Sequence, residues 1–76
     1  MVMQRKKSYK VINSLLLDGG TAVTLETKGE TLYNGKRLKD SKGKVYTIQT
    51  VGMCNNMNIT IIALNEVFND KVLYEL

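Results

Sequence analysis

Short segments in which apolar and polar residues alternate, separated by turn residues, follow one another along this chain. The clearest segment is 21–27, where Val23 and Leu25 alternate with polar residues. Because successive side chains of a strand point to opposite faces, this pattern predicts a strand with one buried face. Alternation recurs at 45–49. At 59–64 it gives way to a continuously apolar run, which is typical of a central strand or of one that changes parity at a bend.

The segment 9–17 is rich in β-branched and apolar residues and predicts the first strand. Its second half is also compatible with a helix, but the turn residues at 18–20 would end that helix early. We therefore expect a strand with one face made of Tyr9, Val11, Leu15 and Leu17.

Four turns separate the segments. Residues 18–20 are Asp-Gly-Gly, and residues 34–35 are Asn-Gly. Asn-Gly is the residue pair most suited to a tight primed turn. A further turn is expected at 28–29. At 40–43 the sequence Asp-Ser-Lys-Gly favours a type I turn, because an Asp side chain can accept a hydrogen bond from the N–H two residues on.

The strand that begins at residue 45 changes parity before it ends. Tyr46 and Ile48 share one face, whereas the apolar Val51 falls on the other and is followed at once by Gly52. A bulge or bend near Gly52 would return Val51 or Met53 to the inside.

Short strands separated by turns, with no proline and no long helical periodicity, predict an all-β fold. The closing segments are a strand at 71–76 and, before it, either a helical turn or an irregular loop that places Phe68 against the core. At 76 residues the chain is one domain. We expect a flexible basic arm at 1–8 and a single small barrel of about six short antiparallel strands at 9–76.

Four segments of the chain, 20–26, 29–38, 45–48 and 72–73, together resemble a known family. Over residues 19–74 the chain resembles the β-barrel second domain of translational GTPases, the elongation-factor-like barrel, without an accompanying GTPase domain. In this family Val-Gly-Asp usually stands where this chain has Asn34-Gly35-Lys36. The resemblance implies an elongation-factor-like or SH3-like barrel and no particular activity.

Positive charge is concentrated in two segments. Residues 1–10 and residues 36–44 each carry a net charge of +4, and the remainder of the chain carries −4. Such segments can steer a polyanion to one face, or they can simply keep a small β protein soluble and block pairing of its edges. Small barrels bind single strands with a basic groove and exposed aromatic rings. The candidate nucleic-acid-binding residues are Arg5, Lys6, Lys7, Lys36, Arg37, Lys39, Lys42 and Lys44.

Tyr33 and Tyr46 are the candidate stacking platforms, although Tyr46 shares parity with Ile48 and is expected inside. Catalytic, metal and cofactor sites are not expected. The chain has one cysteine, Cys54, no histidine, and seven acidic residues that are scattered along it. No apolar run approaches membrane-spanning length, and the basic N-terminus lacks the apolar core of a signal peptide, so we expect a cytoplasmic protein.

A protein-interaction module is the competing class. Met53, Met57 and the apolar run at 61–64 could be buried in a homodimer or against another protein, because methionine adapts to irregular surfaces. We therefore expect a non-enzymatic binding module without a small-molecule substrate. A protein partner or a second copy is its expected ligand, and single-stranded RNA or DNA is the alternative.

Overall fold

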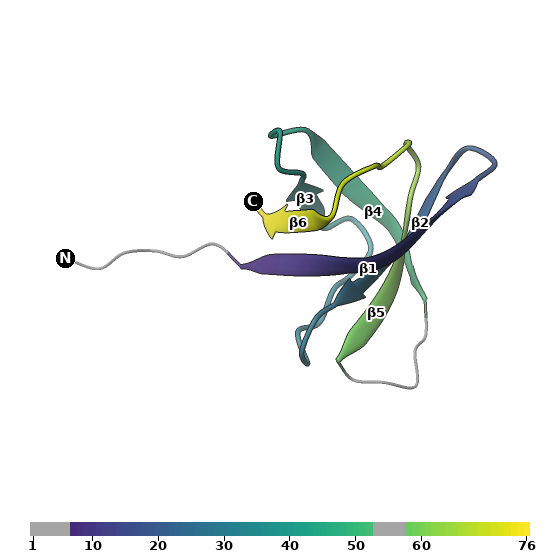
Figure 1. The fold of residues 1–76 in the computed structure, drawn as a ribbon. Helices are drawn as coiled ribbons and strands as arrows, with labels where there is room; N and C mark the ends of the chain where they lie inside the picture. The colour runs from purple at the N-terminus through teal and green to yellow at the C-terminus, as the bar shows by residue number, and fades with distance from the viewer. Residues whose placement is uncertain (1–6, 53–57) are drawn as a thin grey trace.

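Six antiparallel strands form a closed barrel in the computed structural model of the chain, which describes residues 7–52 and 58–76 (Figure 1). Around the barrel the strands follow the order β1-β2-β5-β4-β3-β6. This confirms the predicted small antiparallel barrel. Among the described residues there is no helix that could cross a membrane. The strands are β1 (Ser8–Leu17), β2 (Gly20–Glu26), β3 (Arg37–Lys39), β4 (Val45–Gly52), β5 (Ile59–Leu64) and β6 (Val72–Glu75).

The first and last strands close the barrel. β6 lies between the start of β1 and β3, with Ser8 opposite Tyr74 on one side and Lys39 opposite Tyr74 on the other. The Glu75 N–H donates to the Lys7 carbonyl at 2.8 Å. β1 thus begins at Ser8, within the range predicted as an arm. Residues 1–6 lie outside the described residues.

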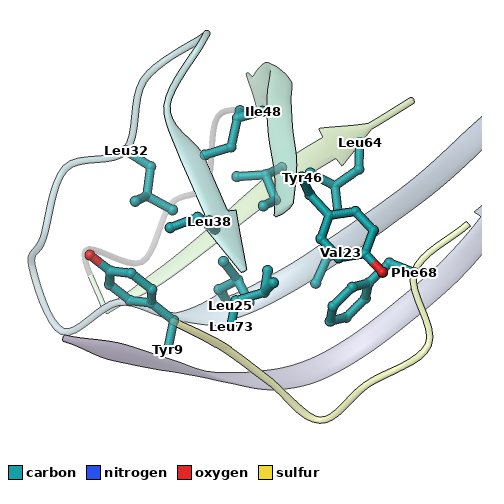
Figure 2. Packing of buried hydrophobic residues seen from close by; sticks show 11 residues of the cluster. Tyr9, Val23, Leu25, Leu32, Leu38, Tyr46, Ile48, Leu64, Phe68 and Leu73 are labelled. Carbon is teal, nitrogen blue, oxygen red and sulfur yellow. The ribbon is translucent and has the colours of Figure 1, made fainter. Parts of the chain in front are cut away.

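The core fills the barrel with side chains from every strand (Figure 2). One member, Phe68, comes from the connection between β5 and β6, which is an irregular loop and not a helical turn. Its ring meets the Tyr46 ring edge to face, with centroids 5.3 Å apart. The Thr21 hydroxyl fixes this loop, since it donates to the Glu66 carbonyl at 2.9 Å and accepts from the Phe68 N–H at 3.0 Å. The core residues are Tyr9, Val23, Leu25, Leu32, Leu38, Tyr46, Ile48, Ile62, Leu64, Phe68 and Leu73.

A bulge in β1 corrects the face predicted for that strand. Val11 lies opposite Leu25, but Asn13 lies opposite Thr24, so one extra residue interrupts the ladder with β2. An extra residue reverses the parity of everything that follows. Tyr9 is buried as expected, whereas Leu15 and Leu17, expected on the same face, are exposed. Leu16 is exposed as well, because this end of the β1–β2 hairpin projects from the barrel (Figure 1).

A second bulge lies earlier in β4 than predicted. The register with β5 shifts between Ile48 and Thr50, not near Gly52. The shift returns Val51 to the inside, where it packs against the core. Gly52 continues the ladder opposite Ile61. The prediction for Met53 lies outside the described residues.

The turn at 40–43 forms as the sequence predicts. The Gly43 N–H donates to the Asp40 carbonyl at 3.1 Å, and the Asp40 carboxylate accepts from the Lys42 N–H at 2.9 Å. The same carboxylate oxygen also accepts from the Lys44 N–H at 2.9 Å. Asp40 therefore accepts from three consecutive residues, Lys42 and Lys44 through its side chain and Gly43 through its backbone carbonyl, and joins β3 to β4 in a tight hairpin.

The primed turn occurs at a different position from the predicted one. Lys28 and Gly29 both have positive φ, 51° and 87°, which a type I′ turn requires. At 34–35 the turn forms, with the Lys36 N–H bonded to the Tyr33 carbonyl at 3.1 Å, but only Gly35 has positive φ. The Asn34 side chain there accepts from the Val51 N–H at 3.0 Å, so its amide fixes the turn against β4.

Candidate nucleic-acid interface

The hairpin formed by β3 and β4 carries the basic segment 36–44, and we call it the basic hairpin. It presents its cations on the outside of the barrel. In β3 the middle residue, Leu38, is fully buried, so Arg37 and Lys39 on either side of it point outward. Lys39 lies opposite Val45 of β4 and opposite Tyr74 of β6. Both neighbours therefore share the outer face with Lys39.

The outward residues of four adjacent strands make one continuous surface, which we call the basic face. Its strands are the start of β1, then β6, β3 and the start of β4. Direct cross-strand neighbours lie on the same side of a sheet, so the register defines the members. They are Ser8 and Lys10 of β1, Val72 and Tyr74 of β6, Arg37 and Lys39 of β3, and Val45 and Thr47 of β4.

The basic face carries three cations and no carboxylate. Among the described residues, Lys10, Arg37 and Lys39 form no ion pair. At one border Glu26 of β2 lies opposite Lys10, with its carboxylate 3.6 Å from the Lys28 ammonium. Two more acids border the face, since Asp40 lines one depression with Lys39 and Tyr74 and Glu75 lines another with Arg37. The positive potential of this face is therefore compensated at its borders and not by any of its own eight residues.

Tyr74 lies at the centre of the basic face. Its ring is half-buried, between Ser8 on one side and Lys39 on the other. With Lys39, Asp40 and the turn residues Ser41 and Gly43 it lines a shallow depression of about 330 Å³. An aromatic ring beside a cation, on a surface with further cations, is the kind of arrangement on which small barrels stack unpaired bases.

The sequence hypothesis missed Tyr74 as well as Lys10. Both alternate with buried neighbours, Leu73 and Tyr9, and this parity marks them as outward residues. The parity does not show that they share a face, because β1, β3 and β6 come together only when the barrel closes. The predicted platforms were Tyr33 and Tyr46.

Tyr46 lies inside the barrel, as expected, and is not a platform. Its hydroxyl donates to the Asp40 carboxylate at 3.0 Å, and burial together with this bond raises the pKa of Tyr46 to about 12. Burial opposes the charged form of Asp40, but the N–H groups of Lys44 and Lys42 and the Tyr46 hydroxyl donate to it and lower its pKa. This carboxylate locks the hairpin that carries the basic face.

Tyr33 is the exposed member of the predicted pair. Its side chain is 57% exposed, and the Lys36 ammonium lies 5.2 Å from its ring centroid. Together with Arg37, the two residues line a second depression of about 350 Å³, at the other end of β3 from Tyr74. Arg37 therefore lies beside Tyr33, whereas Lys39 lies beside Tyr74.

Several predicted lysines are engaged by acids. The Lys36 ammonium is 3.6 Å from the Glu75 carboxylate, and the Lys44 ammonium is 3.3 Å from the Glu66 carboxylate. Lys7 pairs with Glu30, and this hydrogen bond raises the pKa of Lys7. Lys42 is exposed in the turn. Arg5 and Lys6 lie outside the described residues.

The fold therefore brings only some of the predicted nucleic-acid-binding residues together on one face. Arg37 and Lys39 belong to the basic face, where Lys10 and Tyr74 join them, and Lys36, Lys42 and Lys44 surround it. Within 7–52 and 58–76, no three His, Cys, Asp or Glu residues come close enough to hold a metal ion. Comparisons of the chain with protein families, with curated proteins and with solved structures give no match.

Proposed function

We propose that this protein is a non-enzymatic β-barrel binding module that binds single-stranded nucleic acid on its basic face. One observation carries the proposal. Tyr74 lies directly between the strands that present Lys10 and Lys39, on a surface whose eight outward residues include no carboxylate.

Each group on the face has a part in binding. Lys10, Arg37 and Lys39 neutralise phosphates and release counterions, which supplies affinity that depends strongly on salt. The Tyr74 ring offers a stacking surface to a base, and every base has such a surface, so we expect little sequence preference. Tyr33, at the far end of β3, offers a second ring to a neighbouring base.

The hairpin holds these groups in place before the ligand binds. Asp40 fixes the turn through the Lys42 and Lys44 N–H groups, and Tyr46 anchors Asp40 to the core. A preorganised surface loses less conformational entropy on binding. We place the protein in the cytoplasm. The resemblance to the elongation-factor-like barrel stays a prediction, and no part of this binding mode depends on it.

Fluorescence anisotropy with labelled single-stranded RNA and DNA, at low and moderate salt, tests the proposal. We expect Tyr74→Ala to remove a stacking contribution of about 1–3 kcal/mol, a five- to 150-fold loss of affinity, while Tyr74→Phe retains it. Lys39→Gln should weaken binding to all sequences and reduce the salt dependence by about one counterion.

The matched control for Lys39→Gln is Asn65→Asp. Each variant lowers the net charge by one unit, but Asn65 is an exposed residue after β5 and is not one of the eight residues of the basic face. Equal effects of the two variants would show that only net charge matters. Absence of binding at low salt, or binding that Tyr74→Ala leaves unchanged, would overturn the proposal.

A further inference from the structure

A cation and an aromatic ring lie together at each end of β3. Lys39 lies directly opposite Tyr74 of β6, and Arg37 lines the same depression as Tyr33. Both cations point outward, because the residue between them, Leu38, is fully buried. The outer surface along β3 therefore offers the same two groups twice, a positive charge and a ring.

The spacing of the two cations suits neighbouring phosphates of one strand. Arg37 and Lys39 are two residues apart, and a β-strand rises by about 3.3 Å per residue, so their Cα atoms lie about 6.6 Å apart. This is comparable to the separation of successive phosphates along a nucleic-acid strand. Among the described residues neither cation forms an ion pair, so each can neutralise a phosphate of the ligand.

A path across the strands of the basic face meets fewer cations than a path along β3. Toward β1 the next outward residue is Ser8, which carries no charge. The cation of β1, Lys10, has the Glu26 carboxylate beyond it on β2. Toward β4 the residue opposite Lys39 is Val45. A polyanion that crossed the strands would thus leave the positive charge in both directions.

The two acids that border the path along β3 have partners within the protein. The Asp40 carboxylate accepts from two backbone N–H groups and from the Tyr46 hydroxyl. The Glu75 carboxylate lies 3.6 Å from the Lys36 ammonium. Arg37 and Lys39 pair with neither acid, and they are left to the ligand.

We propose that the bound strand runs along β3, with successive phosphates on Lys39 and Arg37, one base on Tyr74 and the next base on Tyr33. This inference rests on the proposed function and adds to it the path and the class of the ligand. A base that stacks on a ring has left both its pairing partner and its neighbour in the strand. The ligand is therefore an unpaired, extended run of at least two nucleotides.

Competition against a labelled single strand measures the length of this ligand. The competitors are 5′-phosphorylated oligonucleotides of one to six nucleotides, so that each nucleotide brings one phosphate. The second nucleotide adds a stacked base and a phosphate contact, so we expect its affinity gain to be about five- to 150-fold or more. Later nucleotides should add less. A duplex of the same length offers phosphates but no free base, and it should compete less well than the single strand.

Tyr33→Ala, tested with two ligands, identifies the second ring. It should lower the affinity for the dinucleotide by about five- to 150-fold, while Tyr33→Phe retains the affinity. The mononucleotide is its matched control, because it can occupy the Tyr74 end alone, and Tyr33→Ala should have little effect on it. An equal loss with both ligands would assign Tyr33 a structural role and overturn the proposed path.

Arg37→Gln tests the second phosphate. It should reduce the salt dependence of dinucleotide binding by about one counterion. Lys71→Gln removes the same charge from an exposed residue outside the basic face and should leave the salt dependence unchanged. Circular dichroism verifies that each variant folds.

The outcomes separate this path from the proposed function. Binding that needs Tyr74 and Lys39, but that neither Tyr33→Ala nor Arg37→Gln weakens, would overturn the path and leave the proposed function standing. Equal affinity for one and for two nucleotides would do the same. Absence of single-strand binding at low salt would overturn both.

Discussion

At the residue scale, the Tyr46–Asp40 pair links the core to the basic hairpin. The raised pKa of Tyr46, about 12, exceeds the value of about 10 expected in the unfolded chain. A raised folded-state pKa means that the neutral hydroxyl stabilises the fold fully below pH 10. This contribution is lost as pH rises from 10 to 12.

Tyr46→Phe removes this contribution. We expect a loss of about 1–2 kcal/mol in the free energy of unfolding at neutral pH, because Asp40 loses one donor and keeps two. The difference between wild type and variant should narrow above pH 10, since only the wild type loses the neutral hydroxyl. Urea unfolding of both proteins at pH 7, 9 and 11 measures this difference in the free energy of unfolding. The exposed Tyr33→Phe is the control, and a difference that is constant with pH would contradict this account.

Lys28 is the one described residue other than glycine with positive φ, at 51°. The left-handed region costs an L-residue roughly 1–2 kcal/mol, while glycine enters it freely. We expect Lys28→Gly to raise the free energy of unfolding by about 0.5–1 kcal/mol. Thermal unfolding measures it against Lys42→Gly, another exposed turn lysine without positive φ, which should lower stability. A lower melting temperature for Lys28→Gly would contradict the expectation.

At the element scale, local chemistry explains which parts of the fold the sequence predicts. The strand at β2 and the turn at 40–43 were predicted correctly, because side-chain alternation and an Asp side chain act within a few residues. The bulges in β1 and β4 were missed or misplaced. The position of a bulge depends on the partner strand. Gly52 indicated a possible bulge, but the sequence does not show that Ala63 pairs with Thr50 and Ile61 with Gly52.

Gly20 begins β2 where the backbone of β5 approaches most closely. A Cβ atom there would lie 2.0 Å from the Leu64 carbonyl oxygen, so the backbone must move to admit any side chain. We expect Gly20→Ala to lower the free energy of unfolding by about 1–3 kcal/mol, which is roughly 4–8 °C in melting temperature per kcal/mol for a domain of this size.

Gly52→Ala is the matched control for Gly20→Ala. Its Cβ would lie 3.4 Å from the Ile61 carbonyl oxygen, close to ordinary van der Waals contact. Replacing a strand glycine by alanine then gains about 0.5–1 kcal/mol from reduced freedom in the unfolded chain. We therefore expect the two substitutions to shift the melting temperature in opposite directions. Equal shifts would show that the approach of β2 to β5 relaxes at little cost.

At the scale of the whole molecule, closure of the barrel creates the basic face. Lys10, Lys39 and Tyr74 lie far apart in the sequence and become neighbours only because β6 pairs with both β1 and β3. Charge clusters in the sequence predicted Arg37 and Lys39. They could not predict Tyr74, since no local pattern shows which strands will be adjacent.

The same closure should be a late step in folding. Pairing β6 with β1 joins Ser8 to Tyr74 and closes a loop of nearly the whole chain, which is entropically unfavourable before the other strands are in place. Leu73 of β6 and Leu25 of β2 are both fully buried, so truncating either removes a similar contact area. We expect Leu73→Ala mainly to accelerate unfolding and Leu25→Ala mainly to slow folding.

Stopped-flow circular dichroism over a range of urea concentrations separates the two rates. Leu→Ala in a core costs about 2–5 kcal/mol, and a domain of this size has only about 4–11 kcal/mol in total. Leu73→Val and Leu25→Val are therefore the milder pair to use if either alanine variant is unfolded in water. Slower folding in the Leu73 variant, with an unchanged unfolding rate, would show that the barrel closes early and that β2 and β5 assemble onto an already joined β1 and β6.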